Sequence, residues 1–141
     1  MAHELLFLAL LRASSAHADA SRKEFAKLEL TEGQPKVLFT LRRANGIVQK
    51  ELAEVCKVRQ STLTVLLTKL EKQGYIYKES CYISGKKHAY RIYLTEAGWK
   101  KADELERVVE NLENQGFLGF SEEERQHLLE LLTRVEENMC S

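Results

Sequence analysis

Apolar residues recur every three or four positions along most of the chain, a spacing that predicts a mainly helical protein. The first helical segment begins at about residue 3 and runs into the twenties, where residues 21–24 form a capping-box pattern that indicates a break or a restart. A second capping box at residues 31–34 opens the next helix, which has Pro35 in its first turn and stops at Asn45 and Gly46.

Two closely spaced helices are predicted after this stop. Residues 49–56 form a short helix, and residues 60–73 form a longer one that ends at Gly74, where a helix C-cap favours a positive φ. The residues expected to face inward are Leu52, Val55 and Cys56 in the short helix and Leu63, Leu66, Leu67 and Leu70 in the long one.

Strand signals are confined to the middle of the chain. Residues 75–83 and 88–94 are rich in Tyr and Ile and are joined through Ser84 and Gly85, which predicts a β-hairpin. Residues 47–48 are long enough only for a bridging strand. The order helix, bridge, helix, helix, hairpin is that of a helix-turn-helix followed by a β-wing.

Further helices flank this middle part. Thr95 caps a helix that runs to about residue 114, and a capping box at Ser121 opens the last one. The predicted fold class is therefore mainly α with a small β-wing (α+β): a winged helix-turn-helix core flanked by N- and C-terminal helices. The last helix carries an apolar set of Leu128, Leu129, Leu131, Leu132 and Val135.

The outer helices contain more leucine than one small domain can bury, which favours helices shared with a second subunit. We expect one domain over residues 1–141, with a DNA-binding lobe at 36–101 and dimerisation helices at 1–35 and 102–141. The residues expected at the dimer contact are Leu5, Leu6, Leu8, Leu128, Leu131 and Leu132.

The distribution of charge changes this picture more than its total does. The 141 residues include 21 Lys and Arg and 21 Asp and Glu, and the composition is that of an ordinary globular protein rather than a disordered one. Residues 36–101 carry a net charge of +9, whereas residues 1–35 carry −1 and residues 102–141 carry −8. A basic middle with acidic flanks suits a protein that presents one face to a polyanion.

In a helix-turn-helix the second helix enters the major groove of DNA, and its first residues meet base edges. Gln pairs with adenine, and Ser and Thr serve either donor or acceptor edges. The alternative is that these positions form only the solvated face of a core helix, although an unpartnered face would favour Glu, Lys and Ala over small hydroxyl residues. The expected contacts are Arg59, Gln60, Ser61, Thr62, Thr64, Val65, Thr68 and Lys69.

Charge also gathers near the tip of the predicted hairpin. Lys86, Lys87, His88 and Arg91 suit the minor groove or the phosphate backbone. The chain shows no aromatic-studded sheet and no GXXG loop of the kinds that bind RNA, so double-stranded DNA is the expected partner.

Three stretches resemble the MarR (multiple antibiotic resistance regulator) family of bacterial transcription factors: LTEGQPKVLFTL at residues 30–41, VQKELAEVCKVRQSTLTVLLTKLEKQGYI at 48–76 and YRIYLTEAGWK at 90–100. The resemblance implies a homodimer that binds a pseudo-palindromic operator and commonly represses. In this family a small ligand lodged between the dimerisation helices and the DNA-binding lobe often releases the protein from DNA.

Two features depart from the family pattern. The family's wing usually carries an Asp-x-Arg motif, whereas this chain has the sequence SGKKH at residues 84–88, which keeps the charge without the carboxylate. Where the family often has an Arg in the recognition helix, this chain has Val65, which favours contact with a thymine methyl group.

Other chemistry has little support. Cys56, on an apolar stripe, is expected in the core, and Cys81 in the wing leaves a cysteine-based redox sensor as an alternative. Ser14 and His17 interrupt the apolar first helix and are candidates for binding a small aromatic or anionic effector, or else they face solvent. The histidines lack metal-ligand spacing, so no metal or cofactor is expected.

The sequence thus predicts a homodimeric, sequence-specific regulator of transcription, most often a repressor, without enzymatic activity. It lacks a Gly-rich phosphate loop and a nucleophile elbow. Glu4 precedes the apolar N-terminal run and Arg12 closes it, which disfavours a secretory signal and favours the cytoplasm, without membrane attachment. The alternative function is a winged-helix module that binds protein instead of DNA.

Overall fold

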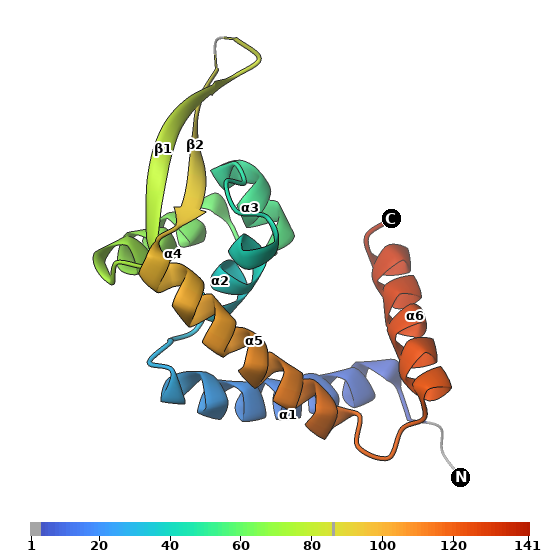
Figure 1. The fold of residues 1–141 in the computed structure, drawn as a ribbon. Coiled ribbons are helices and arrows are strands. Elements are labelled where there is room, and N and C mark those ends of the chain that lie inside the picture. Colours follow the sequence, from blue (N-terminus) through green and yellow to red (C-terminus); the bar gives the residue numbers. More distant parts are fainter. Residues whose placement is uncertain (1–3, 86) are drawn as a thin grey trace. The chain divides into compact units, whose positions relative to one another are not determined.

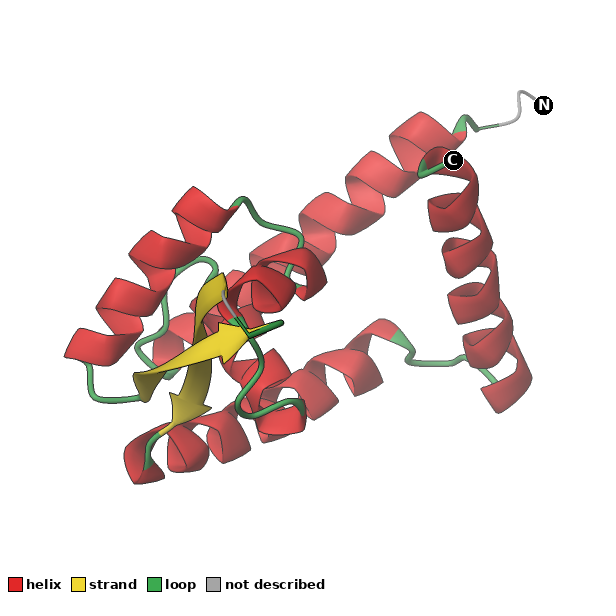
Figure 2. Ribbon diagram, turned by 90° about the horizontal axis from the view of Figure 1, so that it is seen from above, coloured by secondary structure: helices red, strands yellow, loops and turns green. Residues whose placement is uncertain are grey.

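The computed structural model describes residues 4–85 and 87–141. The chain forms two compact units, the first ending at Val109 and the second comprising Glu110–Ser141. Among the described residues, strands occur only in one hairpin and the other elements are helices (Figure 2). In chain order they are α1 (Leu6–Lys27), α2 (Gln34–Arg43), α3 (Gln49–Val55), α4 (Gln60–Lys72), β1 (Ile76–Ile83), β2 (Lys87–Leu94), α5 (Glu96–Gly116) and α6 (Glu122–Met139) (Figure 1).

The core of the first unit lies where α2, α3 and α4 meet the base of the hairpin. The leucine stripe predicted for α4 faces inward, so this prediction is confirmed. The core extends beyond the lobe predicted at 36–101, through Leu30 on one side and Ala102 and Leu105 of α5 on the other. Its largest fully buried residues are Leu38, Leu41, Leu52, Leu63, Leu67, Leu70, Ile92 and Leu105.

Local capping signals fix several helix ends as predicted. The Thr95 hydroxyl accepts a hydrogen bond from the Gly98 amide at 3.0 Å and caps α5. Ser121 and Glu124 bond each other's backbone amides at 3.1 and 2.9 Å, which completes the capping box of α6. Each bond satisfies an amide that the first turn of a helix leaves without a partner.

Two predicted helix starts are wrong. Helix α1 runs without interruption through residues 21–24, and Ser21 is buried within it. Helix α2 begins at Gln34 rather than Thr31, because Gly33 adopts a left-handed conformation (φ 90°) and ends the preceding turn. The Gln34 side chain still accepts a bond from the Thr31 amide at 2.9 Å, so half of the predicted capping box forms outside the helix.

One predicted inward residue of α3 is also wrong. Val55 is 55% exposed, whereas Leu52, Ala53 and Cys56 are buried. Successive residues of a helix are rotated by about 100°, so positions 52, 53 and 56 lie on one arc of the helix and position 55 lies outside that arc. The spacing of Leu52 and Cys56 predicts their burial correctly, but the arc extends toward Ala53.

The two strands pair antiparallel from Ile76 opposite Leu94 to Ile83 opposite Lys87 and extend away from the helices as an arm (Figure 1). The predicted bridging strand exists, because Val48 pairs with Arg91. Two backbone bonds tie this segment to β2: the Gly46 amide donates to the Ile92 carbonyl at 2.8 Å, and the Ile92 amide donates to the Ile47 carbonyl at 3.0 Å.

Apolar side chains remain exposed at the start of α1 and along α6. The apolar run of residues 5–11 in α1 is exposed to a large extent except at Ala9, and no residue of α6 is buried. Each of these helices, taken by itself, therefore presents leucine side chains on an exposed face. No described helix combines the length and the apolar character needed to cross a bilayer.

Candidate nucleic-acid interface

The inward stripe of α4 determines which of its residues face outward. Because every third or fourth position packs into the core, the intervening side chains lie on an exposed face that begins at the N-cap residue Arg59. All eight predicted recognition residues are exposed: Arg59, Gln60, Ser61, Thr62, Thr64, Val65, Thr68 and Lys69.

Hydrogen bonds divide this face into two chemical parts. The hydroxyls of Thr64 and Thr68 donate to the carbonyls of Gln60 and Thr64 at 3.0 and 2.9 Å, and Thr64 also accepts a bond from Gln49 Nε2 at 3.2 Å. Their hydroxyl hydrogens are therefore engaged, which leaves a lone pair and a methyl group at Thr68 for a ligand. Within the described part of the chain, no side-chain bond occupies Gln60, Ser61 or Thr62, so both donors and acceptors are available there.

The predicted wing residues do not share one face. Successive residues of a strand point to opposite sides, so Lys87 and Arg91 lie on one face of β2 and His88 on the other. One guanidinium nitrogen of Arg91 donates to the Gly46 carbonyl at 3.0 Å, which anchors this side chain against the segment before α3. Lys86 lies outside the described residues.

Aromatic contacts fill the wing face that carries His88. Its ring lies edge-on to Tyr90 (4.8 Å between centroids) and to Tyr82 (5.7 Å), and its Nε2 bonds the Ser80 hydroxyl. The Lys78 ammonium lies 5.8 Å from the centre of the Tyr90 ring. The wing that lacks the Asp-x-Arg motif is therefore braced by cross-strand aromatic contacts on this face.

Ion pairs neutralise part of the basic charge. Arg42 Nε donates to Asp103 at 2.9 Å, and Arg43 forms a two-pronged contact with Glu106, so both arginines of α2 are paired with α5. The bond from Arg43 lowers the pKa of Glu106 below its ordinary value, and the same bond raises the pKa of Arg43. Two of the basic residues of the lobe are thus paired with carboxylates, whereas Lys69 and Lys72 of α4 and Lys87 of the wing are exposed.

A cavity of about 470 Å³ lies between α1 and the beginning of α2. The Ser21 residue is 8% exposed, and its hydroxyl has no hydrogen-bond partner among the described residues. Ser14 and His17, the predicted effector residues, are exposed nearer the start of α1 and do not line this cavity. The lining residues are Ala18, Ser21, Arg22, Phe25, Ala26, Leu30, Thr31, Glu32, Gly33, Pro35 and Lys36.

Sequence reasoning missed this cavity because residues 18–26 and 30–36 come together only through tertiary packing. One signal was present in the sequence. Ser21 precedes Phe25 and Leu28 at helical spacing, so a serine occupies the face of α1 that packs on the core.

The three cysteines lie in different environments. Burial raises the pKa of the Cys56 thiol, which disfavours the reactive thiolate at neutral pH. Cys81 is half-buried and Cys140 exposed, and all three are free thiols. Among residues 4–85 and 87–141, no group of His, Cys, Asp and Glu is arranged to hold a metal ion.

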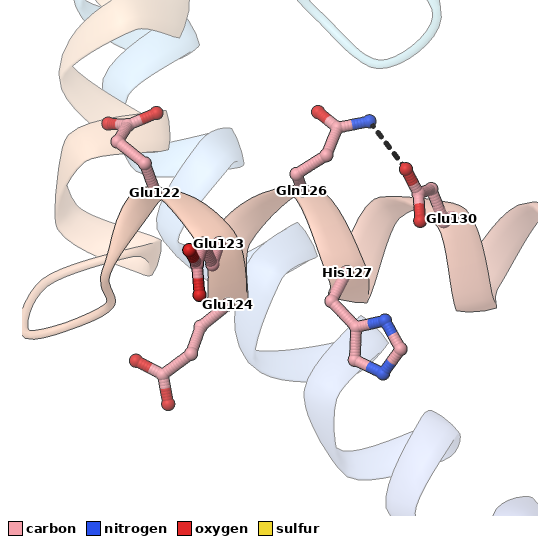
Figure 3. Close-up of a pocket in the computed structure, with 6 residues that line it drawn as sticks. All are labelled: Glu122, Glu123, Glu124, Gln126, His127 and Glu130. Atoms are coloured by element: carbon pink, nitrogen blue, oxygen red, sulfur yellow. Dashed lines mark hydrogen bonds between the residues drawn. The ribbon is translucent and has the colours of Figure 1, made fainter.

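A shallow hollow on α6 is lined mainly by acidic residues. The labelled side chains of Glu122, Glu124 and His127 spread from the helix in different directions instead of converging on a point (Figure 3). Gln126 bonds Glu130 at 3.2 Å, within the helix itself. This hollow has the character of a solvated helix face.

Comparisons with known proteins agree with this geometry. Residues 30–82 match the model of the MarR family. The chain is 35% identical over 119 residues to the HTH-type transcriptional regulator YybA of Bacillus subtilis, covering 84% of this chain and 78% of that protein. It is 32% identical to the HTH-type transcriptional regulator PecS of Dickeya dadantii, covering 84% and 72% of the two chains.

Solved structures show the same architecture. The transcriptional regulator SlyA superposes with a TM-score of 0.84 at 29% identity, over 96% of this chain and 94% of that one. A MarR-family regulator from Listeria monocytogenes, crystallised with a 26mer DNA, superposes with a TM-score of 0.85 at 26% identity, over 97% and 90% of the two chains. The predicted fold class is confirmed.

Proposed function

Because the chain belongs to the MarR family of transcriptional regulators, we propose that it binds double-stranded DNA sequence-specifically, as a homodimer on a pseudo-palindromic operator. It is a DNA-binding regulator of the helix-turn-helix type and not an enzyme. Within the proposal it acts in the cytoplasm and represses the genes next to its operator.

The observation that carries the proposal is the exposed face of α4. Gln60, Ser61 and Thr62 form the first turn of the second helix of a helix-turn-helix, with their side-chain donors and acceptors unoccupied by described neighbours. This is the position from which such helices contact base edges. Lys69 and Lys72 follow on the same helix and suit phosphate contacts.

Binding of a genomic-fragment pool at rising salt tests the proposal. Phosphate contacts release counterions, so affinity for duplex DNA should fall linearly on a log–log plot against salt concentration. Selection from the pool should also recover one palindromic motif. If no duplex is retained at low ionic strength, the winged helix acts as a protein-binding module instead.

The homodimer is proposed on the exposed leucines of α1 and α6. Exposed leucines along the face of a helix, as on each of these two, are typical of an interface between subunits. A dimer on adjacent major grooves would hold its two α4 helices roughly 34 Å apart, one turn of the duplex.

A small anionic effector is proposed in the cavity between α1 and α2. The lining is mostly apolar, with the Ser21 hydroxyl unpartnered among the described residues; its charged residues are Glu32, Lys36 and Arg22, and Arg22 also pairs with Asp19. The N-terminus of α2 also borders the cavity, and Gly33 provides no side-chain cap for it. These groups suit a ligand with a flat apolar body and one carboxylate.

A further inference from the structure

The loop that forms one wall of the cavity also contacts the recognition helix. Thr31, Gly33 and Pro35 line the cavity. Between them, Gln34 points away from it and is 1% exposed, buried against the body of the lobe. Residues 31–34 are therefore in contact with the cavity on one side and with the protein interior on the other.

Two contacts join this loop to α4. Gln34 Nε2 donates a hydrogen bond to Gln73 Oε1 at 2.7 Å, and Gln73 is the C-cap residue of α4. Gly33 lies against the middle of the same helix, since a β-carbon at this position would come within 2.9 Å of Leu66 Cδ2. The loop thus touches the recognition helix both at its centre and at its end.

The oxygen of the Gln34 side-chain amide is hydrogen-bonded as well. Its Oε1 accepts bonds from the Thr31 amide at 2.9 Å and from the Thr31 hydroxyl at 3.3 Å. Thr31 itself lines the cavity. A continuous chain of hydrogen bonds therefore runs from the cavity wall through one buried amide to the end of α4.

We propose that Gln34 is a positioning residue through which occupancy of the cavity is transmitted to the recognition helix. The proposal rests on the DNA-binding function argued above and adds the route of its regulation. Protein interiors are close-packed, so a group that displaces residues 31–33 must displace Gln34 or break its bond to Gln73. Either change removes or shifts a contact that holds the end of α4 against the rest of the lobe.

A tethered occupant tests this route without a known effector. In a Cys81→Ser, Cys140→Ser background, Ser21→Cys is reacted with benzyl methanethiosulfonate, which forms a mixed disulfide in the cavity and releases methanesulfinate. Lys23→Cys, on the exposed side of α1, receives the same label as a control. The measurement is the affinity of labelled and unlabelled full-length protein for the duplex that the unlabelled protein selects.

We expect the Ser21→Cys label to change DNA affinity about tenfold, within the usual range of coupling between sites, and the Lys23→Cys label to leave it unchanged. Gln73→Met replaces the acceptor of the Gln34 bond with a side chain of similar size. We expect this variant to bring the ratio of DNA affinities, labelled to unlabelled protein, close to one. Gln73→Glu keeps an acceptor oxygen and should restore the ratio. A purely structural role for Gln73 would change the melting temperature in both variants and leave the ratio as it was.

Two results would overturn the proposal. The first is equal affinity of labelled and unlabelled Ser21→Cys protein, which would show that the cavity is not coupled to α4. The second is a ratio in Gln73→Met equal to that in the parent, which would place the coupling elsewhere. Failure of the unlabelled protein to bind any duplex would instead overturn the proposed function, and this inference with it.

Discussion

Gly98 occupies a position in the first turns of α5 that has no room for a side chain. A β-carbon there would lie 1.9 Å from the Tyr75 carbonyl oxygen, so the backbone before β1 would have to move. The close approach lets α5 start directly beneath the base of the wing, where the Thr95 amide also bonds the Tyr75 carbonyl at 3.0 Å.

Gly98→Ala should therefore destabilise the protein by about 1–3 kcal/mol, the usual cost of overpacking. Gly116→Ala is the matched control, because a β-carbon at this helical glycine meets nothing within 4 Å. We expect the control to be neutral or stabilising, since alanine favours helix. Urea unfolding of both variants measures the difference, and equal stability of the two would contradict the close approach at Tyr75.

Gln60 and Lys87 are expected to act differently on DNA. Gln60→Ala should change which operator bases are preferred, because the amide is free to pair with a base edge. Lys87→Ala, alone or with Lys86→Ala, should weaken all duplexes about equally and lower the salt slope by about one unit for each phosphate that the variant no longer binds. Competition binding against a randomised operator pool distinguishes the two effects; a change of preferred sequence in the lysine variants would contradict the assignment.

The burial of a residue can be predicted from the sequence where it depends only on which face of a helix the residue occupies. The burial of Leu63, Leu66, Leu67 and Leu70 follows from spacing alone. The environment of Val55 does not, because the direction of the buried arc depends on neighbours distant in sequence. The same holds for Gln34, whose partner Gln73 is 39 positions away.

At the scale of elements, the contact between α2 and α5 is made by charged groups at its edge. Arg43 bonds Glu106 while its guanidinium also lies 3.7 Å from the centre of the Phe39 ring, so stacking and ion pairing hold one side chain. The pair lies at the surface and its contribution is accordingly small.

Glu106→Gln should lower stability at pH 7 by about 1 kcal/mol or less. The pKa of Glu106 is lowered from 4.5 in the folded protein, so the stabilisation is fully present above that value and is lost as the pH falls through the folded pKa. Unfolding at pH 7 and at about pH 3 should show the difference between variant and parent shrinking with acidification. Glu110→Gln, on an exposed residue of α5, serves as control. A pH-independent difference would show that charge is not its cause.

Helix ends are predictable where the signal is a local side-chain bond, as at Thr95 and Ser121. The start of α2 is not, because the left-handed conformation of Gly33 competes with the capping pattern of Thr31 and is selected by packing against Leu66. The hairpin is predicted to within one residue at each end, since β-rich composition and the Ser84–Gly85 turn specify it locally.

At the scale of the whole molecule, the exposed leucines of α6 lead to a prediction about assembly. Leu128→Glu with Leu132→Glu should shift the protein toward monomer, because charged groups would replace apolar surface at the proposed interface. DNA affinity should fall by at least tenfold, since one lobe would bind one half-site. Sedimentation velocity measures the assembly state.

The control for this pair is Glu130→Gln, which changes a charge on the acidic side of α6 and leaves the leucines intact. It should remain in the parent's assembly state. A double variant that sediments like the parent would place the subunit interface elsewhere. The leucine content of the outer helices predicts that they bury their apolar faces against another surface. The spacing of the leucines does not predict which surface that is.

The backbone pairing between residues 46–48 and β2 has a consequence for the proposed complex with DNA. This pairing joins the segment before α3 to the wing, so in the proposed complex the protein would fix the distance between the contacts of α4 and the contacts of the wing along the DNA. A base pair inserted between two such contacts moves one of them by about 3.4 Å along the duplex and turns it by roughly 35°. We therefore expect the proposed operator to keep a constant spacing within each half-site, in addition to the bases that α4 is proposed to contact.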